Sequence, residues 1–240
     1  MKQHEAVIEV MKSNGGYATL GNLYQEVFRI ENVKWGTKTP FASIRRIVQD
    51  ERFFFKIKPG LWALKSEKEK VMKLFDIQKK SPKETDFNHS YFQGLLLEIG
   101  KLRNFETYVP NQDKNKKYLE RPLREFATID QFYNFSYDYI VDRASTIDVS
   151  WFNVRKFPQA FFEVEYSTDF KNSLLKFLEL QDFNVDFRIV ADKKREKQFL
   201  STMSYTAFKN IEHRVKFLSY DVVAELHMKT IELSLIQKDF

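Results

Sequence analysis

The chain has 240 residues, 43% of them hydrophobic and 16% aromatic, so it is long enough for one large domain or two ordinary ones with filled cores. It contains no cysteine, which excludes disulfide frameworks, thiolate metal sites and cysteine nucleophiles. No stretch of eighteen apolar residues runs without charge, and the start, MKQHEAVIEV, lacks the apolar run of a signal peptide. We therefore expect a soluble, cytoplasmic protein with no membrane partner.

The basic residues are concentrated in the first third of the chain. Positions 1–80 hold 16 Lys and Arg against 9 Asp and Glu, whereas positions 81–240 hold 23 against 24. A localised excess of this kind is expected of a phosphate-binding module, because Lys and Arg displace counterions from nucleic acid. A solvated lysine-rich surface explains the same distribution, so charge alone does not separate the two interpretations.

Three helices and a hairpin are predicted over positions 1–65. Apolar periodicity predicts helices over 4–12 and 20–30, the second with Thr19 as its N-cap. Thr39 is expected to cap a third helix, in which Pro40 takes the first position. Two strand-like runs, 53–58 and 61–65, meet at Pro59-Gly60, a turn signal.

The third helix and the hairpin present basic side chains away from their apolar faces. With Phe41, Ile44, Ile47 and Val48 facing inward, the other side of this helix is free to meet DNA. The side chains expected at DNA are Lys34, Lys38, Thr39, Ser43, Arg45, Arg46, Lys56 and Lys58. Three helices, a hairpin and a basic third helix are typical of the winged form of helix-turn-helix.

The segment KTPFASIRRIVQDERFFFKIKPGLWAL, positions 38–64, resembles the HARE-HTH winged helices found in restriction enzymes and chromatin regulators. This resemblance implies recognition of double-stranded DNA by a domain spanning positions 1–65. The alternative is a winged helix that docks another protein. Positions 66–87, rich in Lys and Glu, are expected to form a helical, charged linker with the domain boundary near residue 82.

A second domain is expected over 88–240, with acidic residues on two consecutive strands. In STIDVSWF, Asp148 and Ser150 alternate with apolar residues, and in QAFFEVEYS, Glu163 and Glu165 do the same. If the two strands are neighbours, Asp148, Glu163 and Glu165 converge, and such a cluster usually persists because it binds a cation. All-oxygen ligands suit Mg²⁺, or Mn²⁺ as a substitute, and the four scattered histidines predict no imidazole site.

These residues resemble the active-site motif of the PD-(D/E)xK nuclease superfamily, in which an acidic residue on one strand is followed by Glu-x-Lys on the next. The resemblance covers positions 88–220 and implies an αβββαβ core with a mixed sheet. It makes Asp148 and Glu163 metal ligands together with the carbonyl of Val164, and places Glu165 where most relatives have lysine. Lys171 or Lys176 on the next helix would supply the missing charge, and Gln93 and Glu98 are accessory candidates from an upstream helix.

The resulting hypothesis is a Mg²⁺-dependent DNA endonuclease of the restriction type, acting as a homodimer in host defence. The departure from lysine at Glu165 leaves open a catalytically inactive, nuclease-fold protein that binds DNA or regulates. A protein-interaction adaptor is the third alternative.

Overall fold

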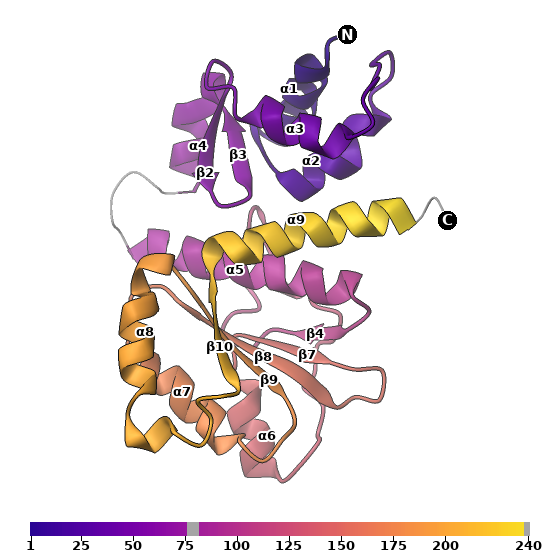
Figure 1. Ribbon diagram of the computed structural model, residues 1–240. Helices are drawn as coiled ribbons and strands as arrows, with labels where there is room; N and C mark the ends of the chain where they lie inside the picture. Colours follow the sequence, from indigo (N-terminus) through magenta and orange to yellow (C-terminus); the bar gives the residue numbers. More distant parts are fainter. Residues whose placement is uncertain (76–81, 238–240) are drawn as a thin grey trace. The chain divides into compact units, whose positions relative to one another are not determined.

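The computed structural model describes residues 1–75 and 82–237, and the chain forms two compact units (Figure 1). The first unit comprises Met1–Ser81 with Ala224–Phe240, and the second Pro82–Val223. The mixed α and β composition expected from the sequence is confirmed. No helix in the described ranges is long and apolar enough to cross a membrane.

The first unit consists of helices packed on a small antiparallel sheet with strand order β1-β3-β2. Its elements are α1 (Gln3–Ser13), β1 (Tyr17–Thr19), α2 (Leu20–Glu26), a 3-10 turn (Val27–Arg29), α3 (Pro40–Val48), β2 (Phe54–Lys58), β3 (Leu61–Leu64), a 3-10 turn (Lys65–Glu67) and α4 (Lys68–Leu74). The three helices and the hairpin agree with the sequence pattern. Strand β1 was not expected, because so short a strand gives no periodic signal.

Two expected helix caps have different outcomes. Thr19 caps α2, since its hydroxyl accepts a hydrogen bond from the backbone N–H of Asn22 at 3.1 Å. Thr39 precedes α3, with Pro40 in the first turn as expected, but its side chain makes no capping bond. Its hydroxyl instead lies 3.4 Å from that of Thr37, so the expectation for Thr39 is corrected.

The C-terminal helix α9 (Tyr220–Gln237) was not expected, and from Ala224 onward it belongs to the first unit. His227 and Ile231 are buried there, and a methyl group placed at Gly21 of α2 would fall 2.2 Å from Ile231 Cδ1. The missing side chain at Gly21 thus lets α9 approach α2 closely. From Ala224 onward, the last helix of the expected domain 88–240 therefore belongs to the first unit.

The expected linker 66–87 is also revised. Its first part contains α4, whose Val71 is fully buried, so this helix is part of the first unit's core. Positions 76–81 lie outside the described residues. Helix α5 (Pro82–Leu102) begins earlier than the expected start at residue 88.

The second unit is a five-stranded mixed sheet with strand order β10-β9-β8-β7-β4, covered by α5 on one face and by α6, α7 and α8 on the other (Figure 1). Its strands and remaining helices are β4 (Glu106–Tyr108), β5 (Lys117–Tyr118), β6 (Arg121–Pro122), α6 (Asp138–Ser145), β7 (Val149–Phe152), β8 (Pro158–Glu165), α7 (Phe170–Glu179), β9 (Asp186–Ala191), α8 (Glu196–Met203) and β10 (Val215–Ser219). Strands β4, β7 and β8 pair antiparallel, and β8, β9 and β10 pair parallel. Strand β8 is central and almost wholly buried, so polar side chains on it must find partners inside the unit.

Candidate functional site

The acidic residues singled out in the sequence lie where β7 and β8 run side by side. The two strands pair antiparallel with Val149 opposite Phe162, which brings Asp148, one position before β7, level with Glu163. The backbone N–H of Val164 donates a hydrogen bond to Asp148 Oδ2 at 2.7 Å. The two strands are therefore neighbours, as the convergence of these acidic residues requires. Their pairing is seen in the strand register and in the bond from Val164 to Asp148.

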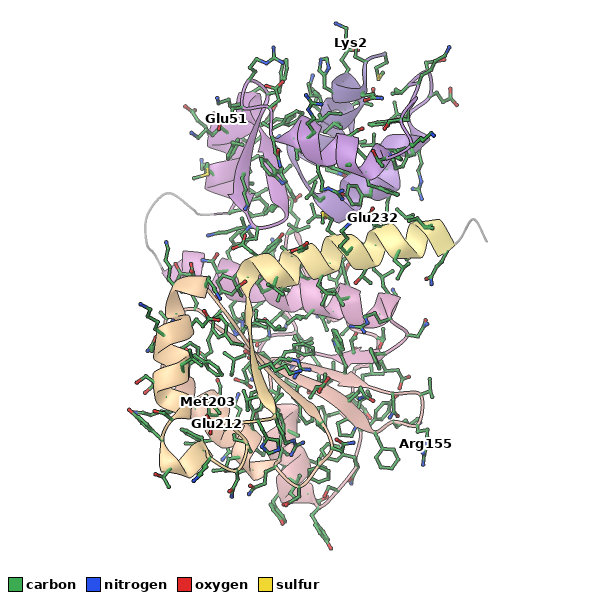
Figure 2. The ribbon with its side chains drawn as sticks, in the orientation of Figure 1. Lys2, Glu51, Arg155, Met203, Glu212 and Glu232 are labelled. Carbon is green, nitrogen blue, oxygen red and sulfur yellow. The ribbon has the colours of Figure 1, made fainter. Side chains whose placement is uncertain are left out.

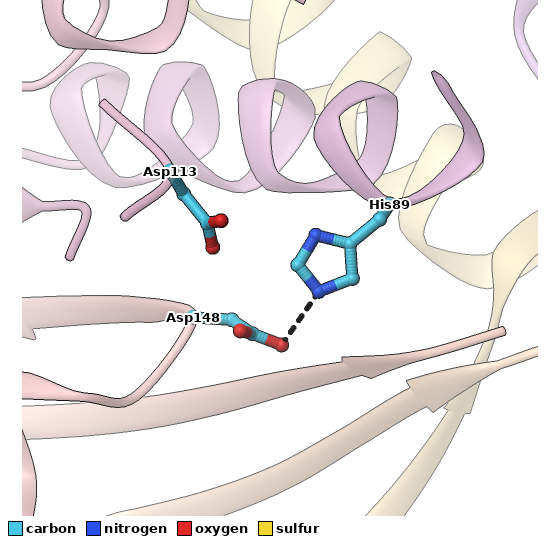
Figure 3. A group of neighbouring side chains, drawn as sticks. All are labelled: His89, Asp113 and Asp148. Atoms are coloured by element: carbon cyan, nitrogen blue, oxygen red, sulfur yellow. Dashed lines mark hydrogen bonds and ion pairs between the residues drawn. The ribbon is translucent and has the colours of Figure 1, made fainter. Parts of the chain in front are cut away.

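On one side, Asp148 is tied to helix α5. His89 Nε2 lies 3.0 Å from Asp148 Oδ2, and Gln93 Nε2 donates to the backbone carbonyl of Asp148 at 3.0 Å. The same Gln93 nitrogen donates to Asp113 Oδ2 at 2.9 Å, and its oxygen lies 3.0 Å from His89 Nδ1. Figure 3 shows His89, Asp113 and Asp148 facing one another, and one ligand atom from each lies within 4.8 Å of the other two.

The scattered histidines offered no imidazole site by spacing, but the structure brings His89 into a group with Asp113 and Asp148 that could hold a metal ion. His89 is far from Asp148 in the chain, and Asp113 is in the loop after β4, so sequence spacing could not reveal the group. The one available signal was the i, i+4 spacing of His89 and Gln93, which puts both on one face of α5. Burial lowers the pKa of His89, but the charge of Asp148 and the hydrogen bond to it raise that pKa, and the net shift is upward.

On the other side, Glu163 and Glu165 are tied to helix α7. Lys176 Nζ lies 2.8 Å from Glu163 Oε1, and Ser173 Oγ lies 3.0 Å from Glu163 Oε2. Ser173 is also within hydrogen-bonding distance of Glu165, which accepts a further bond from Thr168. Burial, together with the nearby charge of Asp148, raises the pKa of Glu163 to about 8 even though Lys176 and Ser173 act to lower it.

The accessory candidates differ in whether they contact Asp148 or Glu163 in the structure. Gln93 is fully buried and reaches Asp148, as proposed, whereas Glu98 accepts a hydrogen bond from the Tyr118 hydroxyl at 2.7 Å and does not join the site. Lys171 lies 3.4 Å from Asp169, and both side chains are half exposed. Lys176 instead lies 2.8 Å from Glu163.

The three expected carboxylates do not form one ligand group. Across residues 1–75 and 82–237, the group of three His, Asp or Glu side chains whose ligand atoms could share one ion is His89, Asp113 and Asp148. Glu163 and Glu165 lie outside it, with the partners on α7 described above. The site thus has two sides that meet at Asp148 and at the bond from Val164.

The residues predicted to meet DNA lie in the first unit, mostly on its surface. Lys34, Lys38, Arg46 and Lys56 are exposed. Arg45 is different: it donates to the Tyr24 hydroxyl at 3.0 Å and to Glu232 of α9 at 3.2 Å, and Figure 2 labels Glu232 along that helix. Burial lowers the pKa of Arg45, but the bonds to Tyr24 and Glu232 and their charges raise it overall, as expected for an engaged guanidinium.

Comparison with known proteins places this sheet and its acidic strands in a restriction-enzyme family. The model of the C-terminal domain of the type II restriction enzyme NmeDI matches residues 71–240, and the chain belongs to that family. The type II restriction enzyme NmeDI of Neisseria meningitidis serogroup C is 29% identical to the chain over an alignment of 161 residues, and the match covers 62% of this chain and 45% of that protein. The chain therefore spans less than half of that relative's length. No solved structure matches the chain.

Proposed function

We propose that the protein is a metal-dependent DNA endonuclease of the restriction type, which hydrolyses phosphodiester bonds of double-stranded DNA with Mg²⁺, or with Mn²⁺ as a substitute. The observation that carries the proposal is the pair Asp148 and Glu163 on adjoining strands of a chain that belongs to a restriction-enzyme family. The alternative of an inactive nuclease fold rested on the lysine missing at Glu165, and Lys176 weakens it by bringing an ammonium to Glu163.

The donor set fits the ion. Asp148, Glu163 and the carbonyl of Val164 offer oxygen atoms, which hard divalent cations prefer. Glu163 is buried beside the charge of Asp148, and its raised pKa is the expected mark of such a position. Bound Mg²⁺ would polarise the scissile phosphate and lower the pKa of a water molecule.

The surrounding side chains then have separate roles. Lys176 takes the place of the motif's lysine from α7, where its ammonium would neutralise charge that builds up on the phosphate. Glu165, held by Ser173 and Thr168, would orient the attacking water. Gln93 fixes the position of Asp148 through its backbone carbonyl.

The element order of the second unit supports the proposed PD-(D/E)xK architecture. Helix α5, strands β4, β7 and β8, helix α7 and strand β9 follow one another in the order αβββαβ, apart from the short β5, β6 and α6 inserted after β4. The first metal-binding acidic residue immediately precedes β7 and the second lies on β8, as the motif requires.

The first unit is proposed to be a winged-helix module that positions the duplex. Three helices with an antiparallel sheet closed by the β2–β3 hairpin support that reading. We assign DNA contact to Lys34, Lys38, Thr39, Ser43 and Arg46 at α3, and to Lys56 and Lys58 on the hairpin. Arg45 is engaged with Glu232 and serves mainly to hold α9.

A homodimer is proposed for cleavage of both strands, since two copies related by a twofold axis present two identical sites to a duplex. Sedimentation of the full chain with and without a DNA duplex measures this directly. A particle of one chain per duplex that still cuts both strands would contradict it.

The test of the endonuclease is cleavage of methylated and unmethylated phage DNA, with Mg²⁺ or EDTA, by the full chain and by Glu163→Gln. Glu212→Gln is the matched control, because Glu212 is exposed and away from the site (Figure 2). We expect discrete fragments with Mg²⁺ from the wild type and from the control, and none from Glu163→Gln. If every variant shifts DNA on a gel and none cuts it, the protein is a DNA-binding regulator. No affinity for DNA at moderate salt would instead indicate a protein adaptor.

A further inference from the structure

The group formed by His89, Asp113 and Asp148 is not used in the proposed cleavage beyond Asp148 itself. We infer that it is a metal position of its own, which takes a divalent transition ion such as Mn²⁺ and shares Asp148 with the Glu163 side of the site. This inference goes beyond the proposed function and stands without it, because ion binding at these residues requires neither DNA nor cleavage.

Three structural segments bring these side chains together. His89 comes from α5, Asp113 from the loop after β4 and Asp148 from the start of β7, and one ligand atom of each lies within 4.8 Å of the others (Figure 3). Two donors that each lie about 2.0–2.2 Å from one ion are at most about 4.4 Å apart, so these atoms would need to approach by no more than a few tenths of an ångström to share an ion. The side chain of Asp113 is 4% exposed and that of Asp148 13%, so the donors are held inside the protein.

The hydrogen bonds of Gln93 decide which nitrogen of His89 is available. Both partners of Gln93 Nε2, Asp113 Oδ2 and the Asp148 carbonyl, are acceptors, so only one orientation of the amide satisfies them. The amide oxygen then faces His89 Nδ1, which must carry a hydrogen. Nε2 is the nitrogen directed at Asp148, and it would exchange the hydrogen of that contact for a metal ion. Histidines that bind metals are usually oriented in this way, by donating their other N–H.

Charge favours an ion at this position. Asp113 and Asp148 place two carboxylates near one another, and the counter-charge on Asp113 comes from Lys116, 2.8 Å from Asp113 Oδ1. The Lys116 side chain is 36% exposed, so its ammonium can turn toward solvent when a cation arrives. An ion here is then matched by one buried and one partly buried carboxylate.

The imidazole selects the kind of ion. Mg²⁺ binds carboxylates and water and rarely takes imidazole, whereas divalent transition ions accept nitrogen and oxygen ligands together. The Glu163 side offers only oxygen, so the two positions have different preferences although they share Asp148. Metal binding by the protein would then involve two ions with different ligand preferences and not one.

The experiment uses metal-stripped full-length protein and Mn²⁺ alone. Binding is followed by the electron paramagnetic resonance signal of free Mn²⁺, and the ligand by nitrogen modulation in pulsed resonance spectra of the bound ion. We expect nitrogen modulation from imidazole in the wild type. His89→Gln should lose the modulation and weaken binding at least roughly 10-fold to 100-fold, the loss seen even for outer-shell partners of metal ligands.

The controls separate this position from the proposed nuclease site and from misfolding. His213→Gln, at an exposed histidine, should change neither signal, and Asp113→Asn should weaken Mn²⁺ binding while the nitrogen modulation of the remaining bound ion persists. Glu163→Gln should abolish cleavage and keep the nitrogen modulation.

Wild-type protein that shows this modulation yet never cuts DNA would overturn only the proposal of an endonuclease. The inference itself is overturned if no Mn²⁺ binds, if the wild type shows no nitrogen modulation, or if the modulation survives His89→Gln or disappears in Glu163→Gln.

Discussion

The two sides of the β7–β8 pair hold their carboxylates in different ways. Asp148 is surrounded by an imidazole, an amide and a second carboxylate from α5 and the β4 loop, whereas Glu163 faces an ammonium and a hydroxyl from α7. In the first set Asp113 has Lys116 as its counter-charge and Asp148 faces His89, whereas in the second Glu163 has Lys176. Neighbouring acidic residues of one motif therefore need not have equivalent roles, because α5 and α7, on opposite faces of the sheet, supply different partners.

The strongest test of this contrast is Asp148→Asn, since Asp148 belongs to both sides. A catalytic metal contributes several kcal/mol of charge stabilisation, so we expect cleavage to fall about 10³-fold. Nitrogen-coupled Mn²⁺ should be lost as well. Asp142→Asn, at an exposed carboxylate on α6, is the control. Cleavage within tenfold of wild type would show that Asp148 is not a ligand.

The second test removes the cation from the Glu163 side only. Lys176→Gln should lower cleavage about 10²-fold to 10³-fold, the range for loss of one group that stabilises developing charge. It should leave nitrogen-coupled Mn²⁺ in place. Lys171→Gln, earlier on α7 and half exposed, should cut normally. If the Lys171 variant is the impaired one, the assignment of the motif's lysine to Lys176 is wrong.

The third test uses the raised pKa of Glu163, which is about 8 against an ordinary value of 4.5. Between those values the folded protein holds a proton that the unfolded chain has lost. This group's contribution to the free energy of unfolding is therefore complete below pH 4.5 and is lost as the pH rises through 8, by roughly 1.4 kcal/mol per pH unit in between. Urea unfolding in EDTA should show Glu163→Gln gaining stability over wild type as the pH rises from about 5 to about 9. Parallel curves would mean that Glu163 is ionised throughout.

The fourth test, with the smallest expected effect, compares two neighbouring arginines of the first unit. Arg45 is hydrogen-bonded to Tyr24 and Glu232, and Arg46 is exposed. Arg45→Ala should cost about 1.5–3 kcal/mol of stability, because it removes hydrogen bonds to charged and buried partners, Glu232 and Tyr24. Arg46→Ala should change stability by no more than about 0.5 kcal/mol, yet lower the salt dependence of DNA binding by about one ion. Unfolding curves and salt titrations of both variants measure this. A stable Arg45 variant with weakened DNA binding would restore Arg45 as a DNA contact.

Part of the site followed from alternation along single strands. Because side chains on a strand point to opposite faces in turn, the pattern of QAFFEVEYS was enough to put Glu163 and Glu165 on one face, and both indeed reach Ser173. Consecutive strands usually pair, and this placed Asp148 at the same level. In the same way, periodicity over positions 1–65 predicted the three helices and the hairpin of the first unit.

The rest depended on which elements pack together, and a local pattern carries no such information. His89 and Asp113 reach Asp148 only because α5 and the β4 loop lie over the start of β7. The choice of Lys176 over Lys171 was decided by the rotation of α7 against the sheet, and the assignment of α9 to the first unit by the close approach of Ile231 to Gly21, near the other end of the chain. Local patterns were enough for most of the helices and strands and for the motif on two strands, since these depend on neighbours in the chain. Only the tertiary structure decided which distant side chains complete the site, because their contacts come from packing between elements.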